Sequence, residues 1–281
     1  MQNTKSNLKN AIFSALSFFA IFNYALTIEE LFQNLLFYKI NKREVSLLEL
    51  KKELDKLFLQ KIIQKRNGLY FIFENKSFGY LLDQRRQYYL NYHKKKKIAL
   101  KWGRRLAKFP GIRFISLVNT VGMKMPKVHS DIDFFIITDK KSLWISRFFI
   151  TLYLKIFGIR PNFKDDKDTI CTSFWISEKD LNLSKIKYQY FDVYLLYWLN
   201  NIITIYDEDN YYFKLSENNK WVNRFLPFHY KNNLEKDLLI NLSSFSKFIK
   251  RIMEFVFINK IFIKILKSLQ MKYFPDKIKI G

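Results

Sequence analysis

The sequence predicts a mixed α/β chain (α+β) with more than one domain. Its length of 281 residues exceeds the roughly 100 to 200 typical of a single domain. Helix-capping patterns and a hairpin signal fill the N-terminal part, short apolar strand patterns flank a helical stretch in the middle, and the last third has helical spacing. Hydrophobic residues make up 49% and charged residues 26%, which argues against a disordered chain or a polytopic membrane protein. The single cysteine, Cys171, excludes a disulfide-stabilised scaffold.

We expect residues 1–26 to contain a buried helix and not a signal peptide. Lys5 and Lys9 precede the apolar run 11–22, as in a signal peptide, but no small-x-small cleavage site follows that run. The run is also shorter than the roughly 20 residues that a membrane span needs. Together with the lone cysteine, these features predict a cytoplasmic protein without an integral membrane segment.

Two capping boxes predict the next two helices. Thr27 is followed three residues later by Glu30, and Ser46 by Glu49. In this pattern the hydroxyl and the carboxylate each accept a hydrogen bond from a backbone N–H group at the start of a helix.

A tight hairpin is expected after these helices. Its strands are residues 61–66 and 69–73, joined by Asn67-Gly68, the pair that a two-residue type I′ turn prefers. Three helices and a hairpin are the element order of a winged helix-turn-helix domain, which we expect over residues 1–76. Its third helix carries mixed charge and no Arg or Asn placed to contact base edges, so DNA binding and a structural or partner-docking role both stay open.

A long basic helix, or a helix pair, is predicted from about Phe78 to Lys108, and its part 77–98 would connect two domains. Lysines and arginines alternate here with aromatic residues, a combination that suits a phosphate backbone with stacked bases. The basic residues are Arg85, Arg86, Lys94 to Lys97, Lys101, Arg104, Arg105 and Lys108, and the aromatic ones are Tyr88, Tyr89, Tyr92 and Trp102. The segment Arg85 to Lys108 is therefore a candidate nucleic-acid-binding surface, and the alternative is a solvated helical face. The net charge of +24 favours a polyanionic partner, although a low-GC genome also enriches every protein in lysine.

Residues 112–138 carry the pattern that indicates chemistry. Residues 112–118 are expected to form a strand that ends in Asn119-Thr120, and after a compact turn Ser130-Asp131-Ile132-Asp133 begins a second strand. Because alternate residues of a strand share a face, Asp131 and Asp133 should point to the same side. Two such carboxylates repel each other unless a cation lies between them, and their oxygens select Mg²⁺ or Mn²⁺.

This region resembles the active site of the polymerase-β-type nucleotidyltransferases. In that superfamily a strand ends in Gly-Ser, a short helix follows, and the next strand presents Asp-x-Asp. The resemblance implies a mixed sheet flanked by helices over residues 99–182, with Mg²⁺ (or Mn²⁺) at Asp131 and Asp133 and an NTP as substrate. It puts Asn119 at the glycine and Thr120 at the serine that holds the nucleotide phosphates, with Ser130 as a further nucleotide-binding residue.

The resemblance extends over roughly residues 11–227, to bacterial proteins that join an N-terminal winged helix to such a domain. The stretches that carry it outside the Asp-x-Asp region are 25–31, 143–147, 170–175 and 219–222. The second of these opens an apolar stretch, 143–159, which predicts a buried helix with Arg147, Thr151 and Lys155 as its polar stripe.

Two departures from the superfamily pattern leave two functions open. Asn119 has a side chain where glycine lets the backbone approach a phosphate, and the third strand, 170–176, offers Cys171 and Ser173 but no acid. Asp168, just before that strand, is the candidate third catalytic residue, ahead of Asp165 and Asp166, and Cys171 is expected to be a buried small hydrophobe. The expected activity is Mg²⁺-dependent transfer of a nucleotidyl group from an NTP to an acceptor hydroxyl. The alternative is a degenerate, non-catalytic protein of this fold that binds nucleic acid or a partner in a regulatory role.

The C-terminal region, residues 183–281, is expected to be helical. The helices are predicted at 188–200, 211–225 and 234–273. The last stretch is basic and amphipathic, so packing on the domain, lying on an anionic membrane and docking a partner are all possible roles.

Overall fold

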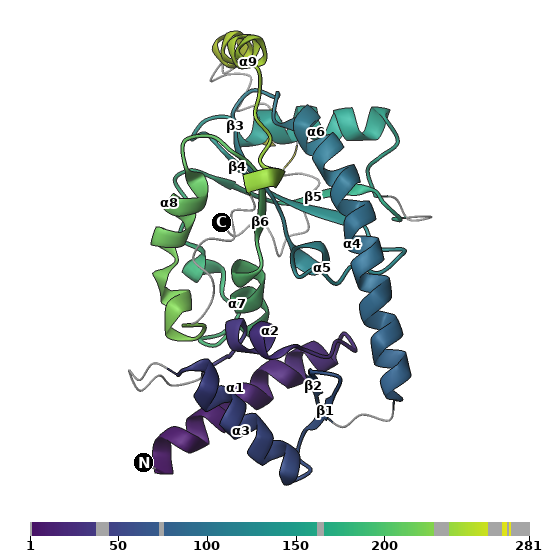
Figure 1. Cartoon of the computed structure of the whole chain (residues 1–281). Coiled ribbons are helices and arrows are strands. Elements are labelled where there is room, and N and C mark those ends of the chain that lie inside the picture. Colours follow the sequence, from purple (N-terminus) through teal and green to yellow (C-terminus); the bar gives the residue numbers. More distant parts are fainter. Residues whose placement is uncertain are drawn as a thin grey trace. The chain divides into compact units, whose positions relative to one another are not determined.

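The computed structural model of the chain describes residues 2–37, 45–72, 76–161, 166–227, 236–257, 266–268 and 270 (Figure 1). The chain forms two compact units, and neither is continuous in sequence. We call Met1–Asn91, Ser184–Asn201 and Asn219–Asn232 the N-terminal unit. Tyr92–Leu183, Ile202–Asn218 and Asn233–Gly281 form the sheet unit.

The N-terminal unit begins with the predicted helices. They are α1 (Gln2–Ala20), α2 (Ile28–Gln33) and α3 (Leu47–Leu59). Both capping boxes are confirmed: the Thr27 hydroxyl accepts from the Glu30 backbone N–H and the Ser46 hydroxyl from that of Glu49. The middle of α1 is buried at Ala11, Ile12, Ala15 and Leu16, as expected for a helix of a protein core.

The predicted hairpin is also present, with strands shorter than expected. β1 (Gln64–Arg66) pairs antiparallel with β2 (Leu69–Phe71). Asn67 and Gly68 between them both have positive φ, as a type I′ turn requires. The chain therefore has the element order that predicts a winged helix-turn-helix.

Later segments complete the N-terminal unit. They include α7 (Val193–Asn200), the 3₁₀ turn Lys220–Arg224 and, from Ser184 on, the 3₁₀ turn Leu183–Ile186. Tyr197 of α7 explains this association, because its ring stacks on Phe18 with centroids 4.1 Å apart and its hydroxyl donates to the Asn34 carbonyl at 2.9 Å.

The sheet unit contains the predicted mixed sheet. In the described part of the chain its strands are β3 (Ile112–Leu117), β4 (Ile132–Thr138), β5 (Ile170–Ser177) and β6 (Ile203–Asp207), in the order β5-β4-β3-β6. β3 is antiparallel to both β4 and β6, whereas β4 and β5 are parallel and are connected through α6 (Leu143–Ile156). The mixed α/β class predicted from the sequence is thus confirmed.

A single long helix, α4 (Phe78–Leu106), contributes residues to both units. Its glycine, Gly103, has a packing reason: a Cβ at this position would lie 2.6 Å from Cδ1 of Ile205 in β6. Glycine therefore permits close approach of the helix to the sheet.

The prediction of a wholly helical C-terminal region is wrong at residues 203–207. This segment, Ile-Thr-Ile-Tyr-Asp, is β6, the edge strand beside β3. Its β-branched and aromatic residues favour a strand, and Ile203 and Ile205 are buried in the core of the sheet unit.

The remaining C-terminal helices are shorter than predicted. α7 begins at Val193 because the Asp192 carboxylate accepts from the Leu195 N–H and caps the helix there. α8 (Tyr211–Asn218) ends before a 3₁₀ turn, and the stretch 234–273 contains a short 3₁₀ turn (Lys236–Leu238), α9 (Ser244–Phe257) and helical residues 266–268. Residues 234, 235, 258–265, 269 and 271–273 of that predicted helix lie outside the described residues. Across the described ranges, no helix has both the length and the hydropathy to cross a bilayer.

Candidate metal centre

Two predicted aspartates converge at the start of β4. The carboxylate oxygens of Asp131 and Asp133 and the sulfur of Cys171 all lie within 4.8 Å of one another. Cys171 joins them because β5 runs parallel to β4 with Cys171 in register with Asp133. Ile132, between the two aspartates, is fully buried in the core, so the predicted alternation is confirmed.

The two carboxylates are unfavourable as a pair of anions. Burial raises the pKa of Asp133 to about 6, and the charge of Asp131 adds to this, while hydrogen bonds from the Asn119 side chain and the Cys171 thiol oppose it. Burial also raises the pKa of Asp131, against the opposing effect of hydrogen bonds from Cys171 and from its own backbone and of the charge of Lys95. A cation between the two would favour their ionised forms and lower both pKa values.

The Asn119-Thr120 turn adjoins Asp133. Val118, at the end of β3, donates to the Asp133 carbonyl at 3.2 Å, and the turn continues as the short helix α5 (Asn119–Gly122). Asn119 has a φ of 53°, in the left-handed region that glycine adopts freely and that asparagine tolerates better than most residues. The resembled superfamily has glycine at this position, and the chain keeps a backbone conformation that suits glycine while the side chain supports Asp133.

Buried methionines hold the turn in place after Thr120. The Thr120 carbonyl accepts from the Met125 N–H at 2.7 Å, and Met123 and Met125 are buried. Thr120 itself is half-buried. The turn is therefore packed against the core at its far end.

Asp168, the predicted third catalytic residue, forms ion pairs instead of joining the three-residue cluster. Its two carboxylate oxygens lie 2.6 Å from Nζ of Lys94 and 2.9 Å from Nζ of Lys95. Burial alone would raise the pKa of Asp168, but the hydrogen bonds and charges of the two lysines outweigh burial and hold the pKa below its ordinary value. The charge of Asp166 raises the pKa of Asp131, and Asp165 lies outside the described residues.

Lys95, which the sequence predicts as part of a basic surface, is buried beside the candidate centre. It is only 1% exposed, and its ammonium donates to the carbonyls of Val128 at 3.3 Å and Ser130 at 2.5 Å as well as to Asp168. It therefore joins α4 to the loops that precede β4 and β5, on which Asp131 and Cys171 depend. The spacing in the sequence already indicated that Lys95 is buried. It lies three residues after Tyr92 and four before Ala99, which puts all three on one face of the helix.

Ser130 is held within its loop. Its hydroxyl donates to the Lys127 carbonyl at 3.0 Å, and its carbonyl accepts from Lys95. The predicted nucleotide-binding residues Asn119, Thr120 and Ser130 thus lie in the two loops that border the Asp131 and Asp133 pair.

Of the four predicted aromatic residues of the basic segment, three are buried and one, Tyr89, is 62% exposed. Tyr88, Tyr92 and Trp102 are buried, and the Arg85 guanidinium pairs with Glu30 at 2.8 Å. The exposed basic residues of the part of α4 in the sheet unit, and of the turn after it, follow a spacing of three and four on one face, which we call the basic stripe: Lys94, Lys97, Lys101, Arg104 and Lys108. The stripe offers charge for phosphates, although its Lys94 is already paired with Asp168, and among these four rings only that of Tyr89 is exposed.

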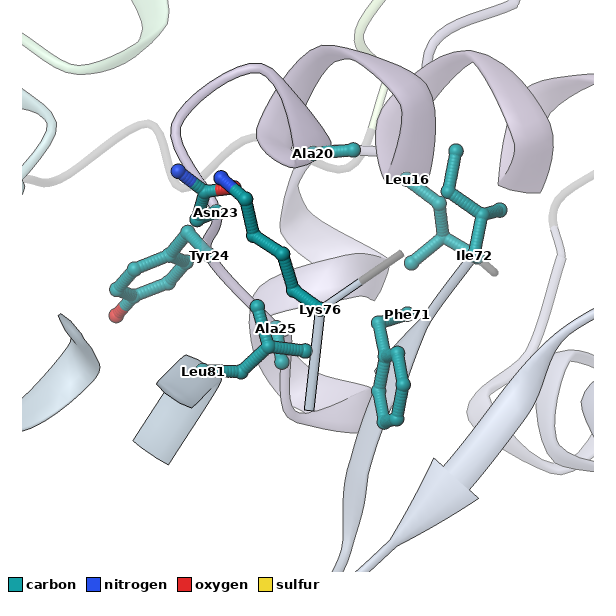
Figure 2. Close-up of a pocket in the computed structure, with 9 residues that line it drawn as sticks. All are labelled: Leu16, Ala20, Asn23, Tyr24, Ala25, Phe71, Ile72, Lys76 and Leu81. Carbon is teal, nitrogen blue, oxygen red and sulfur yellow. The ribbon is translucent and has the colours of Figure 1, made fainter. Parts of the chain in front are cut away.

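A pocket in the N-terminal unit is too small to be an alternative ligand site. It lies between α1, the end of β2 and the start of α4, with Leu16, Phe71 and Leu81 in its wall (Figure 2). Its volume is about 10 Å³, about enough for one water molecule. Lys76 closes one side by donating to the Asn23 side chain at 2.7 Å.

Known protein families, curated proteins and solved structures gave no match to this chain. The likeness to nucleotidyltransferases therefore stays a resemblance of residues and element order.

Proposed function

We propose that the chain is a divalent-cation-dependent nucleotidyltransferase that transfers a nucleotidyl group from an NTP to an acceptor hydroxyl. The observation that carries this proposal is the convergence of the Asp131 and Asp133 carboxylates next to the Asn119-Thr120 turn. A mixed sheet with this strand, turn and strand order supports it. Cytoplasmic residence, where NTPs are available, belongs to the same proposal.

The donor set fits Mg²⁺ or Mn²⁺. Asp131 and Asp133 would hold the cation, since their oxygens are close together and both pKa values are raised in its absence. When bound, such a cation supplies positive charge to the triphosphate and to the attacking oxygen. Asn119 orients Asp133, and we assign the Thr120 hydroxyl the role of donating to a phosphate oxygen.

We assign Asp168 a positioning role and not a catalytic one. A carboxylate with two lysine partners and a lowered pKa is a weak proton acceptor. Its contribution is to hold Lys95, which in turn holds the Val128 and Ser130 carbonyls.

The discriminating experiment measures Mg²⁺-NTP binding and transfer of labelled nucleotide to candidate acceptors. Wild type should bind, and the Asp131→Ala/Asp133→Ala variant should lose binding and transfer. Asp180→Asn, an exposed carboxylate of the same unit, is the matched control and should behave as wild type. Absence of Mg²⁺-NTP binding in the wild type would contradict the proposal.

A second candidate function, a non-catalytic nucleic-acid-binding or regulatory protein, is favoured by the basic stripe. Its five residues extend over 14 positions, or about 21 Å along a helix, a length that matches several phosphates of a nucleic-acid strand. This hypothesis predicts binding to RNA or DNA that weakens steeply with salt. Binding should fall for Lys97→Ala/Lys101→Ala/Arg104→Ala and be unchanged for Asp131→Ala/Asp133→Ala, and absence of binding at low salt would exclude it.

A further inference from the structure

Helix α9 packs on the sheet unit through its polar side. Lys250 is 2% exposed, and its ammonium donates to the Ile112 carbonyl, to the Tyr206 hydroxyl at 3.1 Å and to Glu208 at 2.7 Å. One turn further along, the Glu254 carboxylate accepts from the Gly111 N–H at 2.8 Å and pairs with Arg113 at 3.2 Å. These charged contacts fix which side of the helix faces the protein.

The apolar side of α9 points away from the protein. Its exposed residues are Phe245, Phe248, Ile249, Ile252, Phe255 and Val256. At about 100° per residue, these six positions occupy an arc of about 120° centred opposite Lys250. Phe255 is 90% exposed and Phe248 is 60% exposed, so the arc is open in the chain as described. Such an orientation reverses the usual arrangement, in which the apolar stripe of a surface helix faces the core.

The basic residues around the apolar arc of α9 favour an anionic membrane as its partner. Lys247 and Arg251 lie along one edge of the apolar arc and are exposed. Residues 244–281 contain nine basic residues and two acidic ones; of these, Lys250 is paired with Glu208 and Glu254 with Arg113 inside the protein, which leaves eight basic residues and one acidic one. An apolar arc bordered by lysine and arginine is typical of helices that lie in the headgroup region of anionic membranes.

The described residues that follow α9 lie against another helix. Leu266 is buried, Gln270 donates to the Trp144 carbonyl at 2.8 Å, and the Lys267 ammonium lies over the Trp144 ring at the start of α6. These contacts of Lys267 and Gln270 are with Trp144 of α6 and not with the apolar arc of α9.

We propose that α9 is a peripheral anchor that lies on anionic lipid membranes, with its six apolar side chains in the boundary of the acyl region and its flanking basic residues among the headgroups. β3 runs from Ile112, beside Lys250, to Leu117, next to the candidate metal centre. The membrane therefore lies at the end of the sheet opposite Asp131 and Asp133, as the arrangement of α9, β3 and α5 in Figure 1 illustrates. The proposal is independent of the transferase activity.

Vesicle co-sedimentation of the full chain tests this anchor. Vesicles of phosphatidylcholine and phosphatidylglycerol in equal parts are compared with vesicles of phosphatidylcholine alone. Wild type should bind the anionic vesicles at least about tenfold more tightly than the neutral ones, since apolar burial contributes on both and the attraction of the basic residues contributes only on the anionic ones. Phe248→Ser/Phe255→Ser should weaken binding to the anionic vesicles by about tenfold or more, and Lys247→Glu/Arg251→Glu should weaken it at low salt.

Phe213→Ser is the matched control, because Phe213 is an exposed aromatic residue of α8 in the same unit. This variant should bind vesicles as wild type does, and circular dichroism should show native helix content for every variant. Absence of wild-type binding to anionic vesicles, or equal binding by Phe248→Ser/Phe255→Ser, would overturn the proposal. Sedimentation velocity adds one more outcome that would overturn the proposal. If wild type is an oligomer, Phe248→Ser/Phe255→Ser is a monomer and neither binds vesicles, the apolar arc is a contact between copies of this chain.

Discussion

Replacing Asp133 by asparagine should stabilise the metal-free protein at neutral pH, although it removes a proposed cation ligand. Asp133 is 9% exposed, and burial followed by the charge of Asp131 raises its pKa from 3.8 to about 6. Because one pKa unit corresponds to about 1.4 kcal/mol, ionising Asp133 in the folded protein costs up to about 3 kcal/mol relative to the unfolded chain. Asparagine has nearly the same shape and carries no charge, so we expect a gain of about 1 to 3 kcal/mol in the free energy of unfolding.

The raised pKa of Asp133 determines how the stability difference between variant and wild type changes with pH. The folded-state pKa is the higher one, so the folded protein holds the Asp133 proton more tightly than the unfolded chain does. The cost of ionisation is absent below about pH 4, grows between about pH 4 and 6, and is complete above about pH 6. The stability difference between Asp133→Asn and wild type should therefore be near zero at about pH 4 and reach its full value at about pH 8.

Urea unfolding in EDTA at a series of pH values measures this difference. Asp180→Asn serves as the exposed-carboxylate control and should stay close to wild type throughout. Mg²⁺ or Mn²⁺ should then stabilise wild type by about 2.7 kcal/mol at a concentration of about 100 Kd and leave the variant unchanged. A variant that is less stable than wild type at about pH 8, or a gain of equal size at about pH 4, would refute the reasoning.

Three further substitutions test the surroundings of the centre and the packing of α4. Lys95→Met should destabilise the protein by about 1 to 3 kcal/mol, because the Asp168 carboxylate and the Ser130 and Val128 carbonyls lose the buried ammonium as a partner, whereas the exposed Lys97→Met should change the free energy of unfolding by less than about 0.5 kcal/mol. Cys171→Asp adds a third carboxylate to the centre, so thermal unfolding should show a metal-free variant weaker than wild type and a larger stabilisation by Mn²⁺; an unchanged Mn²⁺ response would separate Cys171 from the centre. Gly103→Ala should cost about 1 to 3 kcal/mol by urea unfolding despite its better helix propensity, because the new Cβ overlaps Ile205. Gly79→Ala, where a Cβ meets nothing closer than 3.9 Å, is its control, and equal effects of the two changes would contradict the packing argument.

The features that the sequence predicted correctly depend on neighbours a few residues apart. The Thr27 and Ser46 capping boxes satisfy backbone donors within one helical turn, and Asn67-Gly68 sets its own turn geometry. The shared face of Asp131 and Asp133 follows from the two-residue period of a strand. These short-range interactions need no partner from a distant part of the chain, so the sequence alone predicts them.

The features that escaped prediction depend on partners far away in the chain. Residues 203–207 become a strand because β3 offers a free edge, and nothing within five residues supplies that edge. Cys171 meets the aspartates only through the parallel register of β4 and β5. Asp168 was nominated for its closeness in sequence to the third strand, but the position of its carboxylate is decided by two lysines of α4.

Buried or paired cations reduce the part of the +24 net charge that can attract an external partner. Lys95 and Lys250 are almost fully buried, and Arg85 and Arg113 are paired with carboxylates, so these four contribute little to an external field.

The charge that remains on the surface includes two arrangements with different chemistry. The basic stripe of α4 consists of lysine and arginine alone, so a polyanion bound to these residues should be released by salt. α9 combines basic residues with exposed phenylalanines, so its attachment to anionic vesicles should keep a salt-resistant part that comes from apolar burial. Salt titration of nucleic-acid binding and of vesicle binding by the same protein therefore separates the two surfaces, because only the second should persist once electrostatic attraction is screened.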